Sequence, residues 1–399
     1  MRILLVSAGV PSPIGQIHLY NLLKVIGSNH DITLICFLDE NSPFAAPPPE
    51  IVLTGGCTMV PFVRKNSLRK ALRAITTWKP VALETYRSED MARAITHTCS
   101  EHRFDVAIIE QLALGQYAPL VRHLPHVLFP VDAVSRLKAQ RYQSTKNPLE
   151  RLLRFLDYRA TKAYERAVYR QFDGVMFVSR DDIRYTVDAG ISDTATVYEL
   201  PNGVDLTYFH PNAHNGQDER SIAFIGNMRN DINEHAVRWF YDHAWPTLHR
   251  EVPDLRWYIV GNDPSARLRR YLERDPNIIL TGYLEDFRPT IWNATLVISP
   301  LQMGAGIKNR VLQAMAMGKA IVASPLSVDG ISAEHRKHLL VATNAGEFVR
   351  YTRLLIEDGR ERLRLSREAR RFVEDHHSLE GAASKLLHIV ERVRRNVST

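Results

Sequence analysis

The sequence predicts an α/β protein with two domains, each built around a parallel sheet. The chain has 399 residues, which is too long for one ordinary core and suggests two or three domains of about 150 residues. Hydrophobic residues make up 45 % of the chain, as in core-forming globular proteins, so disorder is not expected. Short apolar runs alternate with longer amphipathic segments, and this alternation is typical of βα units.

Each half of the chain contains its own series of expected strands, and several of these are apolar throughout, as strands covered on both faces are. The first series is residues 2–7, 31–37, 105–110, 126–131, 174–179 and 196–200. The second series is residues 221–225, 256–260, 278–280, 296–299, 320–323 and 339–341. The polar residues 211–218 between them have no apolar period and are expected to link the domains. Residues 378–397 have apolar positions at helical spacing, which predicts a long terminal helix.

Charge and cysteine usage exclude several other classes of protein. The net charge of +7 favours an anionic partner, but it is spread along the chain and no nucleic-acid module is present, so no nucleic acid is expected. The three cysteines are far apart, so neither a disulfide framework nor a zinc site is expected. No secretory signal and no membrane-spanning apolar run are apparent, and a cytoplasmic location is expected.

Residues 299–324 are the most informative segment. A strand ends near Pro300, a loop with Gly304 and Gly306 follows, and a helix is expected over 307–317, ended by Gly318. Glycines at the carboxyl end of a strand let backbone N–H groups approach an anion at a helix N-terminus. Lys308 is expected in the first turn of that helix, a placement that suits a phosphate ligand. Arg310 lies two residues further on, about 200° around the helix, so one of these two side chains could reach the ligand while the other packs or caps.

This segment resembles the GT-B glycosyltransferases, in particular the retaining family 4 group and its sugar transferases of exopolysaccharide assembly. The matching pattern is P-L-x-x-G-x-G-I-K-N-R-V-L-x-A-M-A-x-G, and the resemblance covers nearly the whole chain. The other matches, in chain order, are residues 177–179 (F-V-S), 201–205 (P-N-G-V-D), 222–226 (I-A-F-I-G), 260–261 (V-G) and 281–283 (T-G-Y), with a weaker one at Tyr86-Arg87.

The resemblance implies two Rossmann-like domains facing each other across a cleft. It assigns residues 1–205 to an acceptor domain, 206–219 to a linker, 220–377 to a nucleotide-sugar donor domain and 378–399 to a helix that crosses back to the first domain. The implied reaction moves a hexosyl group from a nucleotide-diphosphate sugar to a glycan or lipid-linked acceptor. Positioning and stabilisation of the departing diphosphate would supply the catalysis, with no cofactor and no obligatory metal.

The donor-binding residues that the resemblance implies are Gly15, Gly226, Arg229, Gly304, Gly306, Ile307, Lys308, Asn309 and Gln313. Many family members have glutamates at the positions of Ala305 and Gln313, the second bonding the ribose. A glutamine amide bonds a hydroxyl without charge assistance, so weaker donor binding is expected. The family's loop lysine beside Arg229 is missing, so Lys308 would contribute more of the positive charge.

The implied catalytic residues are Asp132 and Lys308. Asp132 follows the expected strand 126–131, where a carboxylate could orient the sugar, take the acceptor proton, or simply cap the next helix. His18 and Glu110 are acceptor-side candidates. No covalent role is assigned to any residue.

Two basic stretches are candidate surfaces for lipid headgroups. Residues 64–79 mix cations with apolar residues at near-helical spacing, which suits a peripheral membrane helix or an ordinary packed one. Residues 136–170 are rich in Arg and Lys, with a helix start expected at Asn147-Pro148. Peripheral contact with the inner membrane face is therefore an expectation. A non-catalytic GT-B scaffold and a sugar-nucleotide epimerase stay open as alternatives.

Overall fold

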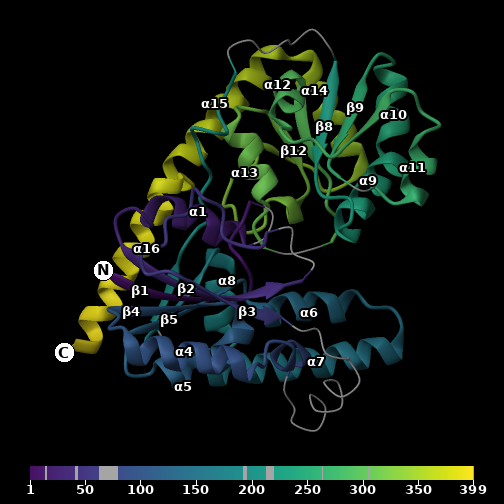
Figure 1. Cartoon of the computed structure of the whole chain (residues 1–399). Coiled ribbons are helices and arrows are strands. Elements are labelled where there is room, and N and C mark those ends of the chain that lie inside the picture. Colours follow the sequence, from purple (N-terminus) through teal and green to yellow (C-terminus); the bar gives the residue numbers. More distant parts are fainter. Residues whose placement is uncertain are drawn as a thin grey trace. The chain divides into compact units, whose positions relative to one another are not determined.

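The computed structural model describes residues 1–13, 16–40, 44–62, 80–191, 196–212, 220–262, 264–303 and 306–398. The chain divides into two compact units. Unit 1 comprises Met1–Gly203 and Leu379–Thr399, and unit 2 comprises Val204–Ser378. Each unit has a parallel sheet covered by helices (Figure 1), so the predicted fold class is confirmed. The basic stretch 64–79 lies outside the described residues.

The sheet of unit 1 has seven strands in the order β3-β2-β1-β4-β5-β6-β7. They are β1 (Arg2–Ser7), β2 (Asp31–Asp39), β3 (Cys57–Phe62), β4 (Val106–Glu110), β5 (His126–Val131), β6 (Gly174–Phe177) and β7 (Thr196–Glu199). Six of them overlap predicted runs; β6 ends before Ser179, whose side chain caps the next helix. The edge strand β3 was not predicted, because its half-exposed sequence is not continuously apolar and contains Pro61, which an edge strand tolerates.

Helices cover both faces of this sheet. Apolar residues of α1 (Ile17–Ile26) and α16 (Leu379–Ser398) pack on one face, and α4 (Glu89–Glu101), α5 (Ala118–Val121) and α7 (Pro148–Tyr169) pack on the other (Figure 1). The remaining elements are α3 (Val81–Thr85), η1 (Leu112–Tyr117), α6 (Val134–Ser144) and α8 (Arg180–Asp188). The predicted start of α7 is confirmed: the Asn147 side chain accepts a hydrogen bond from the Glu150 N–H, and Pro148 is the first helical residue.

The sheet of unit 2 has six strands in the order β10-β9-β8-β11-β12-β13. They are β8 (Ser221–Ile225), β9 (Arg256–Val260), β10 (Ile278–Gly282), β11 (Leu296–Ser299), β12 (Ile321–Ala323) and β13 (Leu340–Val341). The helices are α9 (Asp231–His243), α10 (Trp245–Glu251), α11 (Ala266–Leu272), α12 (Arg288–Asn293), α13 (Asn309–Ala316), α14 (Ala345–Glu357) and α15 (Gly359–His376), with η2 (Pro325–Ser327). Across both units, no described helix is long and apolar enough to span a membrane.

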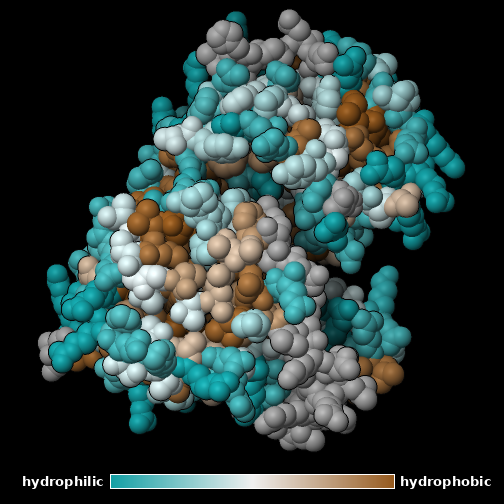
Figure 2. Space-filling view, viewed as in Figure 1, coloured by the Kyte–Doolittle hydropathy of each residue, from teal (hydrophilic) through white to brown (hydrophobic). Residues whose placement is uncertain are grey.

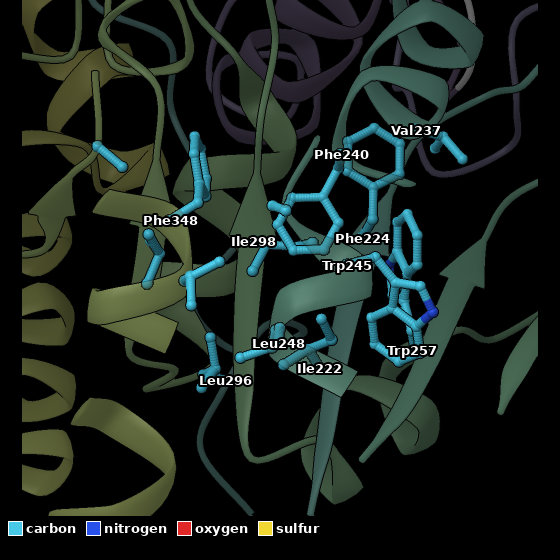
Figure 3. Packing of buried hydrophobic residues seen from close by; sticks show 14 of the residues in the cluster. Ile222, Phe224, Val237, Phe240, Trp245, Leu248, Trp257, Leu296, Ile298 and Phe348 are labelled. Atoms are coloured by element: carbon cyan, nitrogen blue, oxygen red, sulfur yellow. The ribbon is translucent and has the colours of Figure 1, made fainter. Parts of the chain in front are cut away.

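An aromatic cluster fixes α9 and α10 on the sheet of unit 2 (Figure 3). The Phe240 ring meets the Trp257 ring edge-on at 4.9 Å, and Trp245 lies 5.5 Å from Trp257. The Trp245 indole N–H donates to the Asp275 carboxylate at 2.6 Å. Such rings bury large apolar areas, and the indole N–H of Trp245 has the partner that a buried polar group needs.

The junction between the units differs from the expected linker. The boundary falls inside the P-N-G-V-D motif, between Gly203 and Val204, before the predicted start at residue 206. Phe209 is buried in the core of unit 2, and its carbonyl accepts a hydrogen bond from Arg370 at 2.8 Å. The beginning of the predicted linker is therefore part of unit 2, while residues 213–219 lie outside the described residues.

Candidate active site

Three buried serines anchor the loop that follows β11 in unit 2. The Ser327 hydroxyl donates to the Ser299 carbonyl at 2.6 Å, and the Ser299 hydroxyl donates to Ser327 Oγ at 2.9 Å. The Ser324 hydroxyl donates to the Leu301 carbonyl at 2.6 Å. These bonds tie the carboxyl ends of β11 and β12 together, so the loop leaves the sheet from a fixed point.

Lys308 lies one residue before α13, which corrects the expected position in its first turn. The helix spans Asn309–Ala316, and Lys308 is its N-cap residue with extended backbone angles. The preceding turn uses Gly306, whose φ of 77° is in the left-handed region that favours glycine. Lys308 Nζ donates to the Gly306 carbonyl at 2.6 Å, which holds the ammonium at the loop leading into the helix. Gly304 lies outside the described residues.

Arg310 holds Gln313, the residue predicted to bond the ribose. Arg310 Nη1 donates to Gln313 Oε1 at 2.8 Å, and its guanidinium lies 5.0 Å from the centre of the Phe287 ring. Burial lowers the pKa of Arg310 from its usual value. Of the two alternatives for Arg310, the structure shows the packing contact. Gly318, with a φ of 66°, follows the end of α13 as predicted.

The neighbouring strand ends of unit 2 approach closely. A Cβ atom on Gly261 would lie 1.7 Å from the Gly226 carbonyl oxygen, so only glycine fits there. Gly226 donates its N–H to the Val260 carbonyl at 2.9 Å, and the exposed Arg229 follows three residues later. Because β8 and β11 are parallel neighbours, the loops carrying Arg229 and Lys308 leave the same edge of the sheet.

In unit 1, Glu110 and His18 are in direct contact. Glu110 is fully buried at the end of β4, and its Oε1 lies 3.2 Å from His18 Nε2. Its Oε2 accepts hydrogen bonds from the Ala8 N–H at 3.1 Å and the Ser7 hydroxyl at 3.2 Å. The His18 ring meets Phe129 edge-on at 5.3 Å. Glu110 therefore fixes both the loop after β1 and the imidazole. Gly15, in that loop, lies outside the described residues.

Asp132 borders a cavity of about 290 Å3 within unit 1. Two residues of its wall, Gln111 and Val131, have φ angles of 74° and 75°, which are rare for residues other than glycine and unusual for a β-branched one. Asp132 precedes Ala133, the N-cap residue of α6, so the capping role is not observed. The rest of the wall is Pro80, Leu83, Tyr86, Leu112, Ala113, Pro130, Val134, Lys138, Thr161 and Tyr164.

Besides Asp132, α6 and α7 contribute polar groups to this cavity. Lys138 Nζ donates to Asp157 Oδ1 and Thr161 Oγ1, both at 2.8 Å. The buried Tyr164 hydroxyl has no hydrogen-bond partner among the described residues, and burial raises the pKa of Tyr164. A buried hydroxyl of this kind is costly unless a ligand or water satisfies it. The cavity thus offers a carboxylate, an ammonium and a hydroxyl between apolar walls.

A buried carboxyl group lies beside Tyr164 on α7. Glu165 Oε1 accepts a hydrogen bond from the Ser135 N–H at 3.0 Å, and the side chain is fully buried. Burial raises the pKa of Glu165 from 4.5 to about 7, against the lowering effect of Ser135 and of the Lys138 charge. This group was not singled out in the sequence.

The structure thus groups the predicted residues in three places. Gly226, Arg229, Gly306, Ile307, Lys308, Asn309 and Gln313 belong to segments at the carboxyl edge of the unit 2 sheet. His18 and Glu110 lie together on the α1 side of the unit 1 sheet, whereas Asp132 lies with α6 and α7. Lys138, Thr161 and Tyr164 were missed, because only the packing of α7 shows that they share a cavity. Within the described ranges, no cluster of three or more His, Cys, Asp or Glu side chains could hold a metal ion.

Two parallel-sheet α/β units with glycine-bearing loops at the strand ends define the GT-B fold. Solved structures of this fold align over nearly the whole chain. Sucrose-phosphate synthase from Thermosynechococcus elongatus has a TM-score of 0.72 at 14 % identity, covering 98 % of this chain and 99 % of its own. HepE from Anabaena in complex with UDP has a TM-score of 0.68 at 13 % identity, covering 98 % and 100 %.

A family model matches part of this chain, and one relative aligns with most of it. Residues 219–358 match the family described as glycosyl transferases group 1. A 44.6 kDa protein of the cps region of Klebsiella pneumoniae is 21 % identical over 367 residues, covering 88 % of this chain and 89 % of the relative. The chain has the GT-B fold, and the segment that matches the group 1 glycosyl transferases lies in unit 2, which supports a glycosyltransferase.

Proposed function

We propose that this glycosyltransferase moves a hexosyl group from a nucleotide-diphosphate sugar to a glycan or lipid-linked acceptor. The proposed setting is the synthesis of cell-surface polysaccharide or glycolipid, with retention of configuration and without a metal or cofactor. Two relatives support the proposal: HepE has been solved with UDP-glucose, and the Klebsiella relative comes from a cps region.

The position of Lys308 is the main support for a donor site in unit 2. Its ammonium is held at the N-terminal end of α13, where backbone N–H groups and the helix dipole favour an anion. Arg229 follows the neighbouring strand and is exposed at the same sheet edge. Two cations and a helix N-terminus would stabilise the negative charge that develops on a departing diphosphate. Gln313 would bond the ribose.

Unit 1 would bind the acceptor. The Asp132 carboxylate and the Tyr164 hydroxyl border one cavity and can bond the hydroxyls of a sugar ring, while the apolar walls cover its C–H faces. Asp132 would orient the attacking hydroxyl or accept its proton. An ionised Glu110 only accepts hydrogen bonds, so His18 Nε2 would donate to it in this contact.

A thermal-shift series with UDP, GDP, ADP, CDP and TDP tests the donor site. A nucleotide at 100 times its dissociation constant stabilises the folded chain by about 2.7 kcal/mol, which raises the melting temperature by a few degrees. We expect one diphosphate to give this shift, and Lys308→Ala to weaken its binding about tenfold or more. Lys337→Ala, on an exposed lysine of the same unit, is the matched control and should bind like the unchanged chain.

The alternatives predict different results. If no nucleotide shifts the melting temperature of the folded chain, the proposal fails and the non-catalytic scaffold becomes the better account. If a nucleotide sugar binds and is converted without any acceptor, product analysis would identify an epimerase. In the transferase, Asp132→Asn should lower the transfer rate about 100-fold while the nucleotide shift remains.

A further inference from the structure

The N-terminal half of α7 exposes an unusual row of apolar side chains. Leu149, Leu152, Leu153 and Leu156, here called the leucine stripe, are 40–69 % exposed. Their spacing of i, i+3, i+4 and i+7 places them on one face of the helix. Every other described helix exposes at most one large hydrophobic side chain. Isolated exposed leucines are ordinary, but a contiguous row indicates a surface with a partner.

A cationic groove adjoins the leucine stripe. Tyr142, Lys146, Pro148, Arg151, Leu152 and Phe155 line an open groove between α6 and α7 of about 370 Å3. Leu152 belongs to both features, so the apolar and the cationic surfaces are continuous. Lys146 and Arg151 are exposed, and neither has an ion-pair partner in the described part of the chain. Figure 2 shows a small hydrophobic area near this end of the α6–α7 hairpin.

The charge balance around the leucine stripe favours an anionic partner. Residues 141–170 contain eight Arg or Lys residues and three acidic residues, of which Glu150 pairs with Arg154 and Glu165 is buried. The third, Asp157, pairs with Lys138. An apolar face flanked by unpaired cations is complementary to a bilayer that carries anionic headgroups, because the leucines enter the acyl boundary while the cations stay at the phosphates.

We propose that the leucine stripe and its groove dock unit 1 on an anionic phospholipid membrane, with Lys146 and Arg151 on the lipid phosphates. The same helix continues to the cavity: Thr161 on its wall is five residues beyond Leu156, which is about 7.5 Å along the axis. A membrane held at the leucine stripe therefore lies near the cavity proposed for the acceptor. This assigns the acceptor to the lipid-linked class, a conclusion that rests on the proposed function.

Vesicle binding by the full chain tests the docking surface. Vesicles of phosphatidylcholine are compared with vesicles that also contain phosphatidylglycerol, at low and high salt. We expect the chain to bind the anionic vesicles and high salt to weaken binding. Leu149→Ser with Leu153→Ser should lower the partition coefficient at least about tenfold. Lys146→Ser with Arg151→Ser should lower it about twentyfold on anionic vesicles only.

A matched control uses exposed leucines outside the leucine stripe. Leu354→Ser with Leu363→Ser, on α14 and α15, should bind vesicles like the unchanged chain. Equal binding by the leucine-stripe variant and the unchanged chain would overturn the proposal. So would light scattering that gives a dimer which the leucine-stripe variant dissociates, with vesicle binding unchanged, because a second copy would then cover the surface.

A measurement of nucleotide binding tests the donor site independently of the membrane-docking surface. The thermal shift with the same five nucleoside diphosphates is measured on these variants, and the leucine-stripe variant should retain it because unit 2 is unaltered. Vesicle binding without any nucleotide shift would support the docking surface and contradict the donor site. A nucleotide shift without vesicle binding would contradict only the docking surface.

Discussion

The strand ends of unit 1 and unit 2 use different chemistry on similar sheets. In unit 1, the residues at the ends of β4 and β5 include Glu110 and Asp132, and carboxyl groups dominate. In unit 2, glycines follow β8 and β9, and the cations Arg229 and Lys308 lie in the loops beyond. In the proposed function, this difference would let one architecture serve two ligands, because carboxylates accept hydrogen bonds from hydroxyls, whereas N–H groups and cations bind an anion.

Removing the central carboxylate of unit 1 should have the largest effect on stability. Glu110→Ala would leave the Ser7 hydroxyl, the buried Ala8 N–H and His18 Nε2 without their acceptor. We expect the free energy of unfolding to fall by about 4 kcal/mol, measured by chemical denaturation. Glu101→Ala, whose side chain is 55 % exposed, should change it by less than about 0.5 kcal/mol. An equal effect of both substitutions would contradict the structural role of Glu110.

The buried carboxyl of Glu165 should make stability depend on pH. Its pKa is raised from 4.5 to about 7, so the folded state favours the protonated form. Full stability is then present below pH 4.5 and is lost as pH rises through about 7, by about 3 kcal/mol in total. Denaturation of the unchanged chain and of Glu165→Gln across this range should show that loss only with Glu165 present. Glu150→Gln, exposed on the same helix, should keep the pH dependence of the unchanged chain.

The smallest free-energy change is expected when a carboxylate is added to unit 2, where cations follow the strands. Gln313→Glu would give the ribose a charge-assisted acceptor, and Arg310 is already within bonding distance of this side chain. We expect the matching nucleoside diphosphate to bind about fivefold more tightly by calorimetric titration. Gln171→Glu, on an exposed residue of unit 1, should leave binding unchanged. Weaker binding by Gln313→Glu would mean that its charge repels the diphosphate.

The strand positions were largely predictable because parallel strands are buried on both faces. β5, β8, β9 and β11 occupy their predicted residues, since each is a short apolar run bounded by polar or turn residues. β3 was missed because this edge strand is largely exposed, so its residues need not be continuously apolar. Sequence periodicity thus detects burial and fails where burial is partial.

The candidate site was predictable only where its residues are local in sequence. The loop around Lys308 was located to within one residue, and the error arose because Gly306 delays the first helical turn. The contact of Glu110 with His18 joins residues 92 positions apart, and nothing in either segment alone indicates it. Tyr164 faces the cavity only through the packing of α7, so its unpartnered hydroxyl had no sequence signal.

Because α16 belongs to unit 1 but follows unit 2 in the sequence, the order of synthesis affects how this chain folds. Unit 2 is one continuous segment, Val204–Ser378, whereas unit 1 is completed by α16, which is translated after unit 2. Leu386, Ile389, Val390 and Val393 of α16 are buried, so the emerging unit 1 exposes their apolar binding surface until translation reaches them. Unit 2 can fold during translation, whereas the fold of unit 1 is completed only after α16 has been synthesised. A nascent chain stalled before α16 would therefore be an aggregation-prone client for chaperones, with one finished unit and one unfinished.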